Sequence, residues 1–176
     1  MLWCRVDWGI APPLSGWRVR LFGLTLALLC ISPAIAMEDN HPIVVIVSAQ
    51  PTVAPDIHAD DLSLIYWRKK RYAMHGQPLR PVNLSSEHPL RLRFSQQILR
   101  SLPSSQVSYW NGLYFHGVQP PFTVQSEEAM IRYVAETDGA IGYIDACRLD
   151  ERVKPLFWLS DGKLVTEPPS LHCELH

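Results

Sequence analysis

The sequence has no excess of positive charge. Residues 37–176, which follow an N-terminal segment described below, contain 13 Lys and Arg and 16 Asp and Glu. A protein that binds nucleic acid needs a basic patch that attracts phosphates. We therefore expect no nucleic acid among the partners of this chain.

The motifs of common catalytic sites are also missing. The sequence contains no Gly-x-Ser-x-Gly, no His-Glu-x-x-His and no glycine-rich phosphate loop with a lysine. Its seven histidines are scattered, and only residues 172–176 group possible metal ligands, which we expect to form a loose tail. The composition thus predicts a protein that is not an enzyme and has no cofactor and no metal site.

One apolar run is present, and it lies near the N-terminus. Residues 21–35 form it, about 15 residues against the ~20 that a membrane-spanning helix needs. Arg18 and Arg20 precede the run, and the small-x-small sequence Ala34-Ile35-Ala36 closes it. This pattern is typical of a secretion signal. We expect residues 1–36 to be a signal peptide that is cleaved after Ala36, with export to the periplasm.

Cysteine is scarce, and half of it lies in the predicted leader. A lipoprotein cysteine normally follows a small residue, but Cys30 follows a leucine, so a lipid anchor is disfavoured. Cys147 and Cys173 remain in the mature chain, and in an oxidising compartment we expect them to form a disulfide that pins the C-terminal tail. The alternative is two free buried thiols.

Residues 37–176 alternate between strand-like and helix-like patterns, which predicts one α/β domain. Strands are predicted over 43–48, 79–84 and 140–145, with a terminal hairpin of 153–159 and 163–165. Helices are predicted from Asp60 or Asp61 to about 71, over 89–100, shortly after Pro103, and over 127–136.

Several details of these elements follow from single residues. The continuous β-branched run 43–48 indicates a strand buried on both faces. Pro81 favours an edge strand or a strand start for 79–84. Residues 69–71, all basic, should lie in the last turn of the first helix, and Ser126 should cap the last one. We expect Trp110 in the core.

The loop from Asn83 to His88 is the candidate ligand site. Hydroxyl and N–H groups there would stand at the N-terminus of the helix predicted from Pro89, where anions are stabilised. We expect Asn83, Ser85, Ser86 and His88 to bind a small anion. The alternative is that the serines only cap the helix. Catalysis by a serine with His88 is disfavoured, because sequence neighbours seldom face each other correctly.

Four stretches of the sequence follow the order of a known family. Residues 62–69 (LSLIYWRK) stand where that family has a helix ending in an Ile-Phe-x-Gly-Lys-like motif, and residues 76–83 (GQPLRPVN) resemble the start of its next strand. Trp110, Gly117 and Pro120-Pro121 match a tryptophan and a Gly-Pro-rich loop, and residues 136–145 (ETDGAIGYID) are similar to Thr-Pro-Gly-Ser-Ile-Gly-Tyr-Val. The chain resembles the PstS-like periplasmic phosphate-binding proteins of phosphate ABC transporters.

The resemblance implies a type 2 periplasmic-binding-protein-like fold, here a single lobe in which a mixed sheet is flanked by helices. It also implies a substrate-binding protein that holds phosphate or another small anion for uptake or sensing, with a membrane transporter or sensor as partner. One departure concerns the ligand: the family's phosphate-binding Ser, Gly and Thr would fall on His88, Pro89 and Leu90. Proline has no N–H and leucine no hydroxyl, and Glu87 adds a negative charge.

The second departure is length, because the two-lobed members of the family are about twice as long. A single lobe leaves a ligand exposed to water, which weakens charged contacts. The chain would then bind weakly, form a homodimer that completes a cleft, or serve as a periplasmic protein-interaction module without a small ligand. That module would dock on a membrane sensor or transporter through exposed aromatic residues, for which the candidates are Trp67, Trp110, Tyr114, Phe115 and Trp158. Alternatively, these aromatic residues belong to the hydrophobic core.

Overall fold

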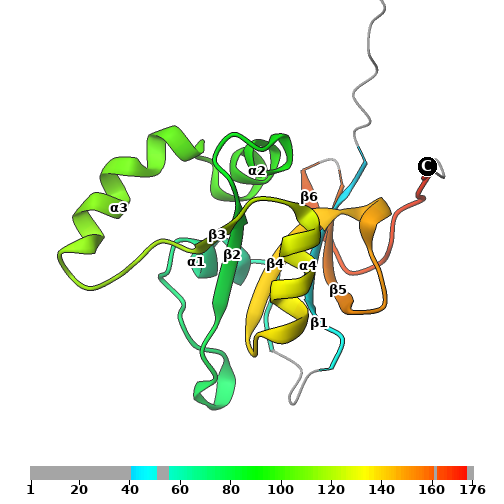
Figure 1. The fold of residues 1–176 in the computed structure, drawn as a ribbon, viewed down its shortest axis with the longest axis horizontal. Coiled ribbons are helices and arrows are strands. Elements are labelled where there is room, and N and C mark those ends of the chain that lie inside the picture. Colours follow the sequence, from blue (N-terminus) through cyan, green and yellow to red (C-terminus); the bar gives the residue numbers. More distant parts are fainter. Residues whose placement is uncertain (1–40, 51–55, 161, 174–176) are drawn as a thin grey trace, which may run out of the picture. The chain divides into compact units, whose positions relative to one another are not determined.

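Six strands form one mixed sheet at the centre of the computed structural model (Figure 1). The structure describes residues 41–50, 56–160 and 162–173. The predicted signal peptide, with its cleavage after Ala36, lies outside these residues. Among the described residues, no helix combines the length and the apolar character needed to cross a bilayer.

The strand order in the sheet is β3-β2-β4-β1-β5-β6. β2 runs parallel to both β3 and β4, β1 runs antiparallel to both β4 and β5, and β5 and β6 form the predicted hairpin. The predicted mixed sheet is therefore confirmed, whereas β3 was not predicted. The strands are β1 (Ile43–Ser48), β2 (Arg80–Leu84), β3 (Phe122–Val124), β4 (Ala140–Asp145), β5 (Val153–Ser160) and β6 (Lys163–Val165).

The prediction that Pro81 marks an edge strand is wrong, but its alternative, a strand start, is right. β2 lies between β3 and β4. Pro81 is opposite Ile141 of β4, and β3 begins to pair only one residue later, at Val82. A proline is tolerated here because it lies at the start of the strand, before the ladder with β3 begins.

Helices cover both faces of the sheet. A Cβ on Gly142 of β4 would lie 2.6 Å from the sulfur of Met130 in α4 (Glu127–Glu136), so α4 packs against that face. Side chains alternate along a strand, and Tyr143 accordingly points to the other face. There it stacks on Phe94 of α2 (Pro89–Phe94), with ring centroids 3.9 Å apart, and α2 lies beside α1 (Asp61–Tyr66) (Figure 1).

The first helix is shorter than predicted, and the cations of residues 69–71 lie beyond it. α1 ends at Tyr66, because Arg68 takes a left-handed conformation (φ 59°) and the N–H groups of Lys69 and Lys70 both bond to the Leu64 carbonyl. This arrangement closes the helix early. Lys70 turns back instead to the start of the helix, where its Nζ lies 2.7 Å from Oδ2 of Asp61.

This ion pair gives the fold a pH dependence. The hydrogen bond from Lys70 lowers the pKa of Asp61 below its ordinary value of 3.8. Because the folded-state pKa is the lower one, the contribution is complete above the ordinary pKa and is lost as the pH falls through the folded pKa. We expect Lys70→Met to cost about 0.5 kcal/mol in the free energy of unfolding at pH 7. Urea unfolding at pH 7 and at pH 2 checks this, and an equal cost at both pH values would contradict it.

The helices predicted over 89–100 and 127–136 are confirmed, the first with one irregularity. α2 continues through a π-helical turn (Ser95–Leu99) and ends at Arg100, whose φ is 53°. α4 has the predicted bounds, and Ser126 caps it by accepting a hydrogen bond from the Ala129 N–H at 3.2 Å. The disulfide between Cys147 and Cys173 is present, with Cα atoms 5.5 Å apart.

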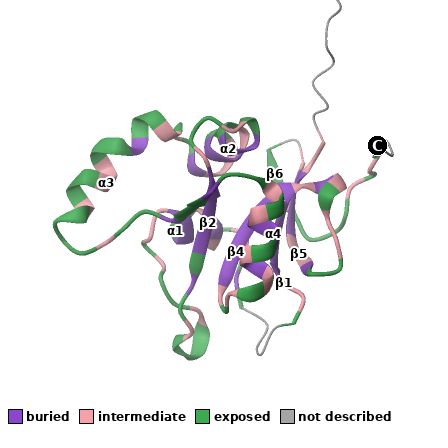
Figure 2. Cartoon of the chain, viewed as in Figure 1, coloured by how far each residue is buried: buried purple, intermediate pink, exposed green. Residues whose placement is uncertain are grey.

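The helix after Pro103 differs from the prediction. A 3₁₀ turn (Pro103–Gln106) leads into α3 (Val107–Tyr114), and no residue of α3 is buried (Figure 2). Trp110 is therefore not a core residue; it is half-buried and stacks on Trp67, which is also half-buried. Of the other aromatic candidates, only Trp158 is in the core, while Tyr114 and Phe115 are exposed.

Candidate functional site

The candidate site lies at the carboxyl ends of β2 and β3. These parallel neighbours end at the same level, because Leu84 is opposite Val124. The chain then leaves β2 toward α2 and leaves β3 toward α4, on opposite faces of the sheet. In open α/β sheets, ligands bind outside the carboxyl ends of strands whose connections diverge in this way. The predicted loop, residues 85–88, follows directly after β2.

The loop itself is a turn that His88 closes. The His88 N–H bonds to the Ser85 carbonyl at 3.1 Å, and Nδ1 of His88 accepts the Leu90 N–H at 3.2 Å. His88 is thus the cap of α2, which rules out the alternative that the serines cap it. Among the described residues, the hydroxyls of Ser85 and Ser86 have no hydrogen-bond partner. They lie at the surface, where a ligand can reach them.

Asn83 lies below the loop and is buried rather than open to solvent. Its Oδ1 accepts hydrogen bonds from Nη1 of Arg91 and, at 3.4 Å, from the hydroxyl of Tyr143. The same hydroxyl accepts the Leu84 N–H at 3.2 Å. Asn83 therefore joins the end of β2 to α2 and β4, and it orients Arg91.

Arg91 was not among the predicted site residues. Its side chain is only 6% exposed, and its second hydrogen bond goes from Nη2 to Oε1 of Gln106 at 3.3 Å. Among the described residues, Arg91 has no carboxylate partner. A guanidinium has five N–H donors, and these bonds use two of them. A buried charge is costly when no opposite charge compensates it, so an anion would stabilise this position.

The neighbours of Arg91 do not neutralise it. Burial raises the pKa of Tyr143, and it raises the pKa of Tyr66 well above the ordinary value. Both phenols are therefore uncharged at neutral pH. Gln106 is neutral as well, and its Nε2 donates to the Ser101 carbonyl at 2.8 Å. The buried polar cluster at the end of β2 consequently carries a net positive charge.

The start of α4, next to β3, has a different electrostatic character. Glu127 and Glu128 occupy its first turn, and both have partners. Glu127 lies 3.2 Å from Nε of Arg148, and a bidentate pair with Arg152 lowers the pKa of Glu128. These acids oppose the positive end of the helix dipole. The charge that would attract an anion thus comes from Arg91 and not from α4.

One group of potential metal ligands lies at the carboxyl end of β4. Ligand atoms of His41, Asp145 and Cys147 lie within 4.8 Å of one another. The sulfur of Cys147 is bound to Cys173, however, and a metal binds the thiolate rather than a disulfide. In the predicted C-terminal group, residues 174–176 lie outside the described part of the chain. The absence of a metal site stays a prediction.

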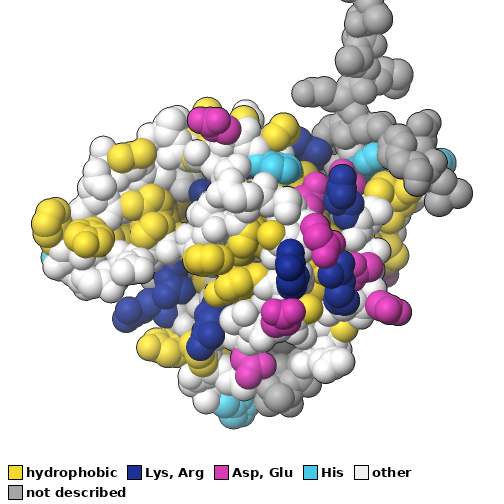
Figure 3. Space-filling view, in the orientation of Figure 1, with side chains coloured by type: hydrophobic (Ala, Val, Ile, Leu, Met, Phe, Trp, Pro, Cys, Tyr) yellow, Lys and Arg dark blue, Asp and Glu magenta, His cyan; other side chains and the backbone are white. Residues whose placement is uncertain are grey.

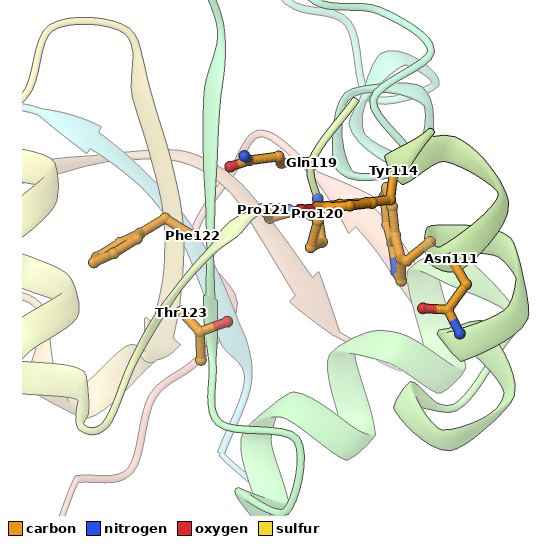
Figure 4. Close-up of a pocket in the computed structure, with 8 residues that line it drawn as sticks. Asn111, Tyr114, Gln119, Pro120, Pro121, Phe122 and Thr123 are labelled. Carbon is orange, nitrogen blue, oxygen red and sulfur yellow. The ribbon is translucent and has the colours of Figure 1, made fainter. Parts of the chain in front are cut away.

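Two surface pockets lie away from the predicted loop. One, of about 460 Å³, opens between Trp110 and Tyr114 of α3 and the segment 119–123 (Figure 4). The other, of about 400 Å³, lies between Asp60, Arg100 and Lys163. Neither is lined by Asn83, Ser85, Ser86 or His88. Neither of these two pockets therefore belongs to the predicted loop.

Comparisons with known proteins bear on the fold. Neither protein-family models nor curated proteins give a match to the sequence. Among solved structures, the chain is similar to an ABC-type phosphate transport receptor from Vibrio cholerae, with a TM-score of 0.52 and 18% identity over 65% of this chain and 45% of the receptor. It is also similar to a putative phosphate ABC transporter substrate-binding protein with bound phosphate from Clostridium perfringens, with a TM-score of 0.51 and 17% identity over 65% of this chain and 44% of that protein.

These likenesses confirm the predicted fold. The chain spans less than half of the length of the two receptors. That the chain is not an enzyme stays a prediction. The mixed sheet with helices on both faces is a PstS-like fold, similar to part of the phosphate-binding receptors of ABC transporters.

Proposed function

We propose that the chain binds phosphate or another small oxyanion at the carboxyl end of β2, as a periplasmic substrate-binding protein for uptake or sensing. Ser85 and Ser86 would donate hydroxyl hydrogen bonds from the surface loop. Arg91 would supply the positive charge, and Asn83 would hold Arg91 in place. His88 would order the loop, since its Nδ1 is engaged as the cap of α2.

The observation that carries this proposal is the buried guanidinium of Arg91. Its hydrogen-bond partners, Asn83 and Gln106, are neutral amides. Hydrogen bonds between a guanidinium and an oxyanion are about twice as strong as neutral ones. The receptor from Clostridium perfringens holds phosphate, which makes phosphate the first ligand to test.

Calorimetric titration with phosphate, and then with sulfate, tests the proposal. We expect Arg91→Met to weaken binding about 30-fold or more, because loss of one partner of a buried charge pair costs at least about 2 kcal/mol. Folding should be affected less, since Asn83 Oδ1 keeps the Tyr143 hydroxyl and Gln106 Oε1 keeps the Trp110 indole N–H as donors. Circular dichroism of the variant checks that it folds.

Two further variants make the titration specific. Ser85→Ala with Ser86→Ala should weaken binding without changing the fold. Arg132→Met removes an exposed arginine from α4 and should leave the affinity unchanged. If the wild-type protein gives no heat with any oxyanion, or if Arg132→Met weakens binding as much as Arg91→Met, the proposal fails.

A second candidate function is a module that docks on a membrane transporter or sensor and binds no small molecule. The exposed aromatic side chains of Tyr114 and Phe115 favour it, because aromatic residues dominate binding hot spots. A co-purification experiment with the membrane fraction separates the two candidates when it is combined with the titration. Retention of the protein on a membrane partner without any anion binding would support the docking module.

A further inference from the structure

α3 and the segment after it form a surface that the described part of the chain leaves uncovered. We call this surface the neutral face and define it by Trp110, Tyr114 and Phe115. Tyr114 is 66% exposed and Phe115 87%. Figure 3 shows hydrophobic side chains over α3, without charged side chains among them. Single exposed apolar residues are common, but a group of aromatic residues marks an interaction site.

The neutral face lies in a stretch without charge. Residues 101–126 contain no Asp, Glu, Lys or Arg, although 19% of the whole sequence is charged. The stretch is nevertheless at the surface, because no residue of α3 is buried. Charge is therefore missing from a place where it would normally aid solubility.

The edge of the sheet is open next to the neutral face. Within the described part of the chain, β3 pairs only with β2 and is the last strand at that end of the sheet. An unpaired edge offers backbone N–H and C=O groups to another strand. Thr123 of β3 lines the pocket that separates the edge from Trp110 and Tyr114, whereas the Phe122 ring turns away from the pocket and stacks on Tyr133 of α4 (Figure 4). The open edge and the aromatic side chains thus belong to one continuous surface.

We infer that the neutral face is the contact between two copies of this chain. In a twofold dimer the same patch is used by both copies, and a charged residue near the axis would meet its own like charge. The absence of charge over residues 101–126 removes this repulsion. Antiparallel pairing of β3 with β3 of the second copy would give the unpaired backbone N–H and C=O groups of both strands hydrogen-bond partners.

Analytical ultracentrifugation of the purified full chain, as the expressing cell processes it, tests this inference. From low to high micromolar concentration, we expect the mass to shift from one chain to two. Phe115→Glu and Tyr114→Glu should raise the dissociation constant of the dimer about 30-fold or more, because like charges that face each other in an interface cost several kcal/mol. Tyr72→Glu is the matched control, since Tyr72 is similarly exposed at 57% and lies outside the neutral face.

Three outcomes would overturn the inference. The first is a single-chain mass at every concentration, and the second is a dimer that the two glutamate variants leave intact. The third is a monomer that floats with phosphatidylcholine vesicles and loses this property in Phe115→Glu, which would assign the neutral face to a lipid surface. Phosphate titration of the same variants distinguishes this test from that of the proposed function, because the anion site does not include the neutral face.

Discussion

Replacement of Gly139 by alanine is expected to lower the free energy of unfolding by about 2–5 kcal/mol. Gly139 has a φ of 71°, in the left-handed region, where a side chain costs roughly 1–2 kcal/mol. A Cβ at this position would also lie 2.1 Å from the carbonyl oxygen of Pro78. That neighbour is backbone and cannot rotate away, so overpacking adds about 1–3 kcal/mol.

The location of Gly139 explains why the strain cannot be relieved locally. Its carbonyl accepts the Arg80 N–H at 2.8 Å, which joins the start of β2 to the start of β4. Movement of Gly139 away from Pro78 would strain this hydrogen bond. Gly76→Ala is the control, because Gly76 has a similar φ of 77° and no atom within 4 Å of an added Cβ. Urea unfolding of both variants measures the difference, and equal losses would show that the contact with Pro78 does not matter.

Removal of the disulfide between Cys147 and Cys173 is the second large expected effect. The bridge joins residues 26 apart and holds the C-terminal tail against the turn that follows β4. For a loop of this length the chain-entropy model gives about 3–4 kcal/mol. We expect the double variant Cys147→Ala with Cys173→Ala to lose about this much in the free energy of unfolding.

Thermal and urea unfolding with and without a reducing agent check the disulfide prediction. The reduced wild-type protein and the double variant should unfold at nearly the same denaturant concentration. The reducing agent should leave the double variant unchanged. A wild-type protein whose stability is the same in both conditions would contradict the prediction.

Most of the sheet could be predicted from the sequence because its strands carry strong local signals. Residues 43–47 are all β-branched, and in β1 the residues from Ile43 to Ile46 are fully buried. α4 could be predicted to the residue, since Ser126 and the two acids after it mark its start. β3 could not be predicted, because a strand of three residues after two prolines is defined by its partner β2 and not by its own pattern.

The errors in the helices and the site have a tertiary origin. α1 ends early because Arg68 turns into the left-handed region, a conformation that no residue type in this stretch favours. Arg91 was missed because arginine is normally exposed, and only the contact with Asn83 and Gln106 shows that it is buried. The loop after β2 could be located from its residues, but the charge beneath it could not.

The place of β1 between β4 and β5 in the sheet has a consequence for how the chain folds. Val44 is opposite Ile144 on one side and Trp158 on the other, so the first strand pairs only with segments about one hundred residues further along the chain. Contacts between such distant segments slow folding, because the loop must close before the contacts form. Synthesis proceeds at about 5–20 residues per second, so several seconds pass before β1 finds both partners. During this time its apolar residues are free to bind a chaperone or to aggregate.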